Sequence, residues 1–433
     1  MPGEGADDDV SARRLRVFRW RQSRALSMIA VLVLLTLVIP PTVYGMSTVD
    51  PALAEPFPIA DESPNQERFP AVAQDTRRSR FLVVYQDDGG LQAVCLSSQG
   101  TRLRSYSVSS GGDYPDVAYN HGHDQYLIVW QEIGRIRGAR LAGDCPPGGL
   151  SPAFDISADR PGNEGRPAVA YNHNPSFLDY LVVWMDIDNF VGVWARRVSA
   201  TDLAPSSFEV AGGTATSSNS DPDVAYNLNH NEYLVVYVHD PGGLDNKDIY
   251  GRRVYNANGG GLLEEHVIDS SAKDQRVPAV AAYRLNYTNP YVVVFQDYWN
   301  DLPGDVRGYL CNVDGEPVNL LNIATVGGRQ EMMPAIASAE PLGYTVVWQQ
   351  TGDGFDIFGR RVSPVGALQP TFEVSLGSRL LPPGHDEAMP AVAGGSPAAL
   401  VVWHEAAPGQ DLNVFGRFLG YRVYLPLTLR LTH

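Results

Sequence analysis

Residues 334–374 read PAIASAEPLGYTVVWQQTGDGFDIFGRRVSPVGALQPTFEV and contain the pattern on which the whole chain is built. A Pro-Ala-Ile-Ala tetrad is followed by Val346-Val347-Trp348, then by Ile357-Phe358-Gly359-Arg360, and last by Phe372-Glu373-Val374. Short runs rich in β-branched and aromatic residues, separated by Gly, Pro and Asp, predict β-strands. The stretch therefore predicts four short strands in succession.

This pattern recurs along the chain at intervals of 45 to 56 residues. We number the repeats 1 to 7 by their tetrad prolines, which are Pro70, Pro115, Pro167, Pro222, Pro278, Pro334 and Pro390. Self-similarity at this period, with four strands per repeat, is typical of β-propeller blades. We therefore predict an all-β fold over residues 55–420, a seven-bladed β-propeller of four-stranded blades. The Pro-Ala-Val strand is expected to lie innermost, where the sheets crowd the axis.

The last repeat provides only three strands, ending near Phe418. A fourth-strand sequence, Phe57-Pro58-Ile59-Ala60, stands near the other end of the chain instead. We expect this segment to pair with repeat 7 and close the ring in a 3+1 arrangement, since an unpaired edge strand promotes aggregation.

The repeat layout resembles exported bacterial seven-bladed propellers of uncharacterised function and, more distantly, propeller repeats of the TolB type. The resemblance covers about residues 55–420 and concerns the fold, because propellers carry many unrelated functions. The sequence lacks the Gly-His to Trp-Asp pairing of WD40 blades and the Ser-x-Asp-x-Gly-x-x-Trp box of sialidases.

The amino-terminal segment indicates export. Six arginines between residues 13 and 24 precede the apolar run 25–39 and Pro40-Pro41, which is the order of a secretory signal. We assign residues 1–45 to a signal peptide or a signal anchor, 46–54 to a linker, and 421–433 to an apolar tail. Cleavage before Met46, cleavage before Glu55 and retention as an anchor all leave the folded part outside the cytoplasm, secreted or at the cell surface.

Composition limits the partners. Acidic residues outnumber basic ones 49 to 33, the formal charge is -16, and Lys247 and Lys273 are the only lysines. A protein that follows a phosphate backbone needs the opposite charge, so we expect no nucleic-acid partner. The three cysteines allow one disulfide at most, and Cys95 with Cys145 is the nearer pair, with Cys311 left over.

Carboxylates recur at two positions of the repeat that fall on one face of the predicted ring. Some stand three residues before a tetrad proline and others follow the second strand: Glu67, Glu164, Glu331, Glu387, Asp87, Glu132, Asp186, Asp297 and Glu405. Such a face could bind a cation or sugar hydroxyls. Alternatively, these carboxylates cap loop amides or pair with Arg196, Arg252, Arg360 and Arg417.

Two sets of residues are candidate sites. For a hard cation such as calcium, which prefers oxygen ligands, the richest clusters are Asp186 with Asp188, Asp245 with Asp248, and Asp353 with Asp356, although none completes a calcium-loop motif. For a ligand, an aromatic pair in the fifth repeat is flanked by polar residues that could stack a sugar ring. That set is Asp297, Tyr298, Trp299, Asn300 and Asp301.

No catalytic motif stands out. We therefore predict a non-enzymatic binding or scaffold protein, acting as a monomer without a required cofactor. Its expected partner is a glycan of the envelope or an extracellular protein, and it would touch a membrane only through an uncleaved amino-terminal segment. The alternative is a carbohydrate-active enzyme, a glycoside hydrolase or lyase, on the same scaffold.

Overall fold

The strands follow the repeats. The structure is a computed structural model. It describes residues 51–60, 65–160, 162–188, 191–204, 206–242, 246–255, 261–272, 274–285, 287–298, 304–352, 354–375, 386–394, 398–406 and 411–421. Residues Pro51–Tyr421 form one compact unit. Its secondary structure is β-strand, which confirms the predicted all-β class. Within the described ranges we find no helix of the length and hydropathy that crossing a bilayer requires.

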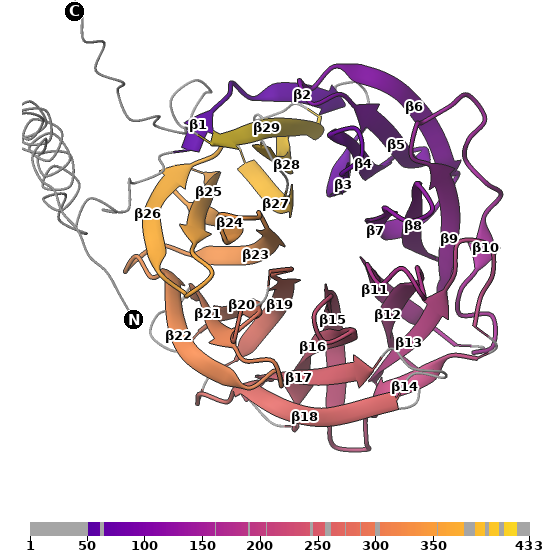
Figure 1. Ribbon diagram of the computed structural model, residues 1–433. Coiled ribbons are helices and arrows are strands. Elements are labelled where there is room, and N and C mark those ends of the chain that lie inside the picture. Colours follow the sequence, from indigo (N-terminus) through magenta and orange to yellow (C-terminus); the bar gives the residue numbers. More distant parts are fainter. Residues whose placement is uncertain are drawn as a thin grey trace, which may run out of the picture. The chain divides into compact units, whose positions relative to one another are not determined.

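Each tetrad lies in the innermost strand of its repeat, as the small and stiff residues Ala, Val and Pro predict. Each of these strands contacts its counterpart in the next repeat, and β27 contacts β3. The seven strands surround a central axis (Figure 1). They are β3 (Arg68–Asp75), β7 (Asp113–Asn120), β11 (Glu164–Tyr171), β15 (Ser218–Asn227), β19 (Gln275–Ala282), β23 (Glu331–Ser338) and β27 (Asp386–Ala393).

The second strand of each repeat is buried along most of its length, because it is enclosed by sheets on both faces. These strands are β4 (Arg80–Asp87), β8 (Gln125–Glu132), β12 (Tyr180–Asp186), β16 (Glu232–Asp240), β20 (Tyr291–Asp297), β24 (Tyr344–Thr351) and β28 (Ala398–Ala406). The third strands are β5 (Gly90–Leu96), β9 (Arg135–Ala142), β13 (Gly192–Val198), β17 (Asp248–Tyr255), β21 (Asp305–Cys311), β25 (Phe355–Val362) and β29 (Asn413–Tyr421).

The fourth strands form the rim (Figure 1). They are β6 (Arg102–Ser109), β10 (Phe154–Asp155), β14 (Phe208–Ala211), β18 (Gly261–Asp269), β22 (Pro317–Ala324) and β26 (Leu368–Glu373). Repeats 1 to 5 form separate four-stranded antiparallel sheets. Repeats 6 and 7 share a nine-stranded sheet through one parallel pair, Phe355 with Asp386.

Two amino-terminal strands pair with the last strand of repeat 7. The β2 strand (Phe57–Ala60) lies antiparallel to β29, with Phe57 opposite Gly416, at the position that a fourth strand occupies in the other repeats. The short β1 strand (Pro51–Leu53), within the segment predicted as a linker, also pairs with β29. Ile59 is buried together with Phe81 of repeat 1 and Leu400 of repeat 7.

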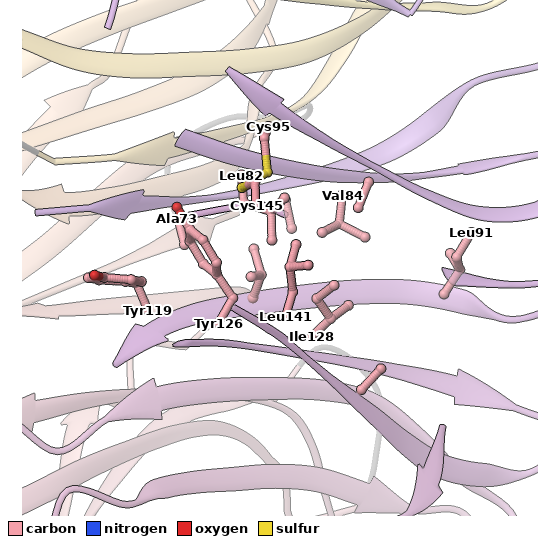
Figure 2. Close-up of a cluster of buried hydrophobic side chains, with 14 of the residues drawn as sticks. Ala73, Leu82, Val84, Leu91, Cys95, Tyr119, Tyr126, Ile128, Leu141 and Cys145 are labelled. Carbon is pink, nitrogen blue, oxygen red and sulfur yellow. A yellow bond between two sulfur atoms is a disulfide. The ribbon is translucent and has the colours of Figure 1, made fainter. Parts of the chain in front are cut away.

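The hydrophobic core lies between sheets and is divided into clusters. Each cluster combines side chains from two consecutive repeats; the one between repeats 1 and 2 contains Leu82, Val84, Tyr126 and Ile128 (Figure 2). The cluster that contains Ile59 joins repeat 7 to repeat 1 in the same way. Apolar burial therefore links every repeat to both of its neighbours.

An arginine of the third strand connects consecutive repeats through backbone hydrogen bonds. Arg196, Arg252, Arg360 and Arg417 donate to the carbonyls of Ile156, Val210, Ile323 and Val374 at the end of the preceding fourth strand, at 2.6, 2.8, 2.8 and 2.5 Å. Repeat 1 has Val94 at this position, and Arg102 of β6 donates to the Ile59 carbonyl instead, at 2.5 Å. The same link is thus present between β2 and repeat 1.

The recurrent third-strand glycine has a packing role. In repeat 5 a Cβ at Gly308 would lie 2.4 Å from the Val293 carbonyl oxygen, so backbones approach closely there. In repeats 6 and 7 a Cβ at Gly359 or Gly416 would lie 2.7 Å from a side chain of the fourth strand, Phe372 or Ile59 respectively. The glycine therefore leaves room for the side chain that covers the edge of its own sheet.

The only disulfide among the described residues connects repeats 1 and 2. It joins Cys95 of β5 to Cys145, which follows β9 (Figure 2). Cys311 of β21 is free and buried. Burial raises the pKa of the Cys311 thiol above its usual range. Since the thiolate is the reactive form, Cys311 is expected to be inert while the protein is folded.

This cysteine pattern predicts a thiol count. The folded protein should show no thiol that reacts with Ellman's reagent, and one thiol per chain should appear in 6 M guanidinium without reductant. Cys311→Ala should remove that single thiol. Three reactive thiols in the unfolded, unreduced protein would contradict the Cys95–Cys145 bond.

The burial of Ile59 predicts a large effect of charge at this position. Ile59→Asp places a carboxylate between repeats 7 and 1 and should lower the free energy of unfolding in urea by about 3–5 kcal/mol. Pro58→Asp on the same strand is a matched control, because Pro58 is exposed, and it should change the free energy by less than about 1 kcal/mol. Equal losses in the two variants would show that β2 is not packed between these repeats.

Candidate functional site

The residue before each tetrad proline has the same unusual backbone conformation. Its φ lies between 48° and 51°, in the left-handed region, in all seven repeats. Residues other than glycine pay about 1–2 kcal/mol for this conformation, and a residue before proline normally adopts an extended one. These seven residues are Phe69, Tyr114, Arg166, Asp221, Val277, Met333 and Met389.

A β-bulge accompanies each of these residues. The register between the first and second strands shifts across the position in every repeat, for example between Arg276 and Ala279 and between Met332 and Ala335. A bulge redirects a side chain relative to the regular pleat. Here the seven side chains and the prolines that follow them surround a cavity of about 260 Å³. We call this cavity the axial mouth. It lies at the start of the innermost strands. The turns between second and third strands are on the same face of the molecule.

One side of the axial mouth is aromatic and charged. The Phe69 and Tyr114 rings lie 5.1 Å apart, and the Arg166 guanidinium lies 5.0 Å from the centre of the Tyr114 ring. The Arg166 Nε is 3.2 Å from the Asp221 Oδ1. The Arg166 side chain is 46% exposed, so this pair is accessible to a ligand.

The other side of the axial mouth is apolar. Val277, Met333 and Met389 occupy the equivalent positions in repeats 5, 6 and 7, and each is half-buried. Methionine is flexible and polarisable, and adapts to ligands of different shape. A ligand in the mouth would therefore meet one apolar side and one side that provides an aromatic ring and an ion pair.

The glutamates that precede the tetrads by three residues point inward. Glu67, Glu164, Glu331 and Glu387 are each at most 2% exposed. The Ser157 hydroxyl donates to Glu164 at 3.1 Å and accepts from the Ile136 amide at 3.0 Å. Glu164 therefore stabilises the segment that connects repeat 2 to repeat 3. Burial raises the pKa of Glu164 to about 7 and that of Glu387 to about 8. These four carboxylates are structural and do not form an exposed ring.

The carboxylates that follow the second strands are also engaged within the protein. The Gly89 amide donates to Asp87 at 2.8 Å, and the Ser109 hydroxyl donates to Glu132 at 2.6 Å. The indole of Trp403 donates to Glu405 at 3.3 Å. The capping alternative therefore describes them better than an open acidic surface, and the four third-strand arginines are directed mainly to backbone carbonyls.

The five residues predicted to bind a sugar do not form one described site. Asp297, at the end of β20, is 1% exposed and lies 3.0 Å from the Arg307 Nε. The Tyr298 hydroxyl accepts a hydrogen bond from Gln296 at 2.8 Å. Trp299, Asn300 and Asp301 lie outside the described residues.

Of the residues predicted to bind a cation, Asp186 is paired with Arg160 at 2.6 Å and Asp188 is exposed. Asp248 and Asp356 are buried, and Asp245 and Asp353 lie outside the described residues. Across the described ranges, no three His, Cys, Asp or Glu side chains converge as a metal site requires.

The comparisons bear on the fold alone. No family model and no curated protein matches the chain. Among solved structures, it is similar to a protein of unknown function from Dyadobacter fermentans, at 11% identity and a TM-score of 0.52 over 87% of this chain and 100% of that one. It is also similar to the β-propeller domain of Cps50 (Swd1) from Myceliophthora thermophila, at 9% identity and a TM-score of 0.50 over 82% of this chain and 99% of that one. The chain folds as a β-propeller.

Two aspartates lie along the axis of the propeller, below the mouth. The tetrads of repeats 2 and 4 contain Asp116 and Asp223 in place of alanine. The Val169 amide donates to Asp116 at 2.8 Å, and the Val280 amide donates to Asp223 at 2.7 Å, so each carboxylate joins its strand to the next repeat. Burial raises the pKa of Asp116 to about 6 and that of Asp223 to about 7, and the Asp116 charge adds to the shift at Asp223.

These raised values predict the sign of a pH effect. An aspartate that titrates near 7 when folded, but near 4 when unfolded, stabilises the protein at low pH and loses that contribution as the pH rises through 7. Asp223→Asn retains an acceptor for Val280. Its free energy of unfolding relative to wild type, measured in urea, should therefore increase from pH 5 to pH 8. For the exposed control Asp88→Asn, the difference in free energy from wild type should be the same at pH 5 and pH 8. An equally pH-independent difference for Asp223→Asn would contradict the raised pKa.

Proposed function

We propose that the chain is an exported seven-bladed β-propeller that binds a glycan or a protein outside the cytoplasm through the face that carries the axial mouth. The seven innermost strands, and the pairing of β2 with β29, support four-stranded blades closed in a 3+1 arrangement. The order of charged and apolar residues in positions 13–39 supports export through a signal peptide or a signal anchor. The protein acts as a monomer and without catalysis.

The main support for a binding function is that the seven mouth residues share one backbone conformation but carry varied side chains. The backbone is the same in seven repeats, including a left-handed residue that costs free energy each time. The side chains at these positions are Phe, Tyr, Arg, Asp, Val and twice Met, whereas the tetrads beside them hardly vary. A purely structural position in a repeat would be expected to repeat its side chain as well. Diversified side chains on a fixed backbone are typical of a binding surface.

The chemistry of the mouth favours a protein segment over a sugar as its occupant. Phe69, Val277, Met333 and Met389 have no group that hydrogen-bonds sugar hydroxyls well, but they fit an apolar side chain. Arg166 and Asp221 can bind polar backbone or charged groups at the rim of the same cavity. Ile133, 97% exposed at the turn between β8 and β9, adds another apolar contact on this face.

A glycan would instead use the loop after β20, where Tyr298 and Trp299 are neighbours in sequence. Calcium, if it takes part, would be bound by loops that contain Asp186, Asp188, Asp245, Asp248, Asp353 or Asp356. The two sites can be tested separately, because they involve different residues.

Binding should depend on the apolar side of the mouth. We expect Met333→Glu/Met389→Glu to weaken capture of an envelope or extracellular protein by at least about tenfold, since loss of one buried apolar side chain costs about 1.5–3 kcal/mol. Capture would be measured by quantitative mass spectrometry on immobilised chain lacking residues 1–45. Val365→Glu is the control, because Val365 is exposed on the opposite face, at the turn between β25 and β26. Unchanged capture by the mouth variant would refute this role.

A panel of envelope polysaccharides, with and without chelator, tests the glycan alternative on the same material. Retention that is lost in Trp299→Ala, but kept in the mouth variant, would place the ligand on repeat 5 and make it a sugar. Sensitivity of that retention to chelator would add calcium.

A further inference from the structure

A second cavity, of about 250 Å³, lies at the other end of the axis. It is lined by the last residues of the tetrads and by the residues that follow them, and its two sides carry side chains of different size. The residue four positions after the tetrad proline is Tyr119, Tyr171 and Tyr226 in repeats 2, 3 and 4, but Ala282, Ser338 and Gly394 in repeats 5, 6 and 7. The small residues leave room opposite an aromatic wall. We call this space the basal cavity.

The Arg284 side chain lines the basal cavity, and its guanidinium forms no ion pair with a described carboxylate, although the Glu340 charge acts on it from farther away. Within the described part of the chain, its guanidinium forms no hydrogen bond or ion pair. Only its backbone is engaged, since its amide donates to the Glu340 Oε1 at 2.5 Å and its carbonyl accepts from Asn229 at 3.1 Å. Burial lowers the pKa of Arg284, as expected for a cation removed from water.

This arrangement is unusual for the protein. The third-strand arginines Arg196, Arg360 and Arg417 are also buried or half-buried, and each donates two or more hydrogen bonds to carbonyls. A desolvated charge without a partner is costly, and a perturbed ionisable group that lines a cavity is a candidate for ligand binding. The Arg284 guanidinium therefore indicates an anionic ligand.

Two further polar groups face the same space. The His173 ring packs 4.6 Å from the Tyr171 ring and 6.2 Å from the Tyr226 ring, and in the described residues its nitrogens have no hydrogen-bond partner. Burial, together with Arg284, lowers the pKa of His173 to about 2, so the ring is neutral and can donate one N–H. The Tyr171 hydroxyl accepts from the Gly122 amide at 3.1 Å and keeps its own proton for donation.

We propose that the basal cavity binds a small organic carboxylate, with Arg284 as the cationic anchor. The two oxygens of a carboxylate match the paired N–H groups of a guanidinium, and His173 and Tyr171 supply further donors. The organic part of the ligand lies against Tyr226 and the alanines at positions 282, 337 and 393. A phosphate has additional charged oxygens, for which this apolar wall offers no donor.

The local charge supports this ligand although the whole chain is acidic. Arg77 follows the first strand of repeat 1, and Thr76 beside it lines the cavity and bonds the His121 ring at 3.0 Å. Asp124 pairs with Arg78 at 2.6 Å and with Arg77 at 3.8 Å, and Asp75 pairs with Arg78 at 3.0 Å. These acids are thus engaged by Arg77 and Arg78, and Arg284 is left as the cation that lines the cavity.

Benzoate is a suitable probe, with benzyl alcohol as its neutral analogue. The full-length protein, purified from an exporting host, should bind one benzoate in isothermal titration calorimetry and melt at a higher temperature in its presence. Benzyl alcohol should produce neither effect. Arg284→Gln should weaken benzoate binding at least 30-fold, and Arg284→Lys about tenfold, because lysine keeps the charge but not the paired N–H groups.

Arg329→Gln, at an exposed arginine on the mouth face, is the matched control and should bind benzoate as wild type does. Because Arg284 lacks a partner, Arg284→Gln should melt no lower than wild type without benzoate. His173→Leu provides a second test that keeps the packing beside Tyr171, and it should weaken binding. The proposal fails if benzyl alcohol binds as well as benzoate, if Arg284→Gln retains benzoate, or if neither benzoate nor phosphate binds at millimolar concentration. Tighter binding of phosphate than of benzoate would overturn the organic carboxylate.

Discussion

The fold depends on one constraint: each sheet can bury its apolar faces only against the sheets beside it. The core clusters show this directly, since each combines side chains of two consecutive repeats, such as Val84 with Ile128. A single sheet cannot bury its own apolar faces, so a ring of such repeats is stable only when the first and last repeats are also in contact. Ile59 and the Arg102 hydrogen bond to its carbonyl make that contact here. The amino-terminal strand therefore matters as much as any complete repeat.

The same constraint explains where variable chemistry is found. The faces of the sheets are fully used by packing, and the inward-facing glutamates are used to hold the passages between repeats. Both ends of the innermost strands can vary without disturbing that core. At the mouth, the left-handed residue before each proline turns a side chain toward the axis, and at the basal end the residues after the tetrad do so.

Much of the fold could be predicted because strands leave a local mark in the sequence. Val346-Val347-Trp348 and its equivalents are enclosed on both faces, which requires apolar residues at every position, and the Phe57-Pro58-Ile59-Ala60 segment copies a fourth strand closely enough to identify its place. The sites were less accessible. A residue in the left-handed conformation is usually a glycine, which can be recognised in the sequence, but Val277 and Met389 are not glycines. Only their recurring position before a proline could have indicated them. The sequence left Glu164 and Glu387 either on a ligand-binding face or in structural capping roles. Here both are buried next to serine hydroxyls, and burial raises the pKa of each.

The two ends of the axis also show why net charge is a poor guide to the ligand of this protein. A formal charge of -16 indicates an acidic surface, yet several of the carboxylates that seemed to define it are capped or buried. The desolvated groups that contact a bound molecule determine which ligand is recognised, because salt screens exposed charges beyond about 10 Å. At the mouth those groups are methionines, an aromatic pair and one ion pair, and at the basal end they are an arginine, a neutral histidine and tyrosine hydroxyls. A single scaffold can thus offer two different ligands two different chemistries on one axis, and the acidity of the outer surface limits neither.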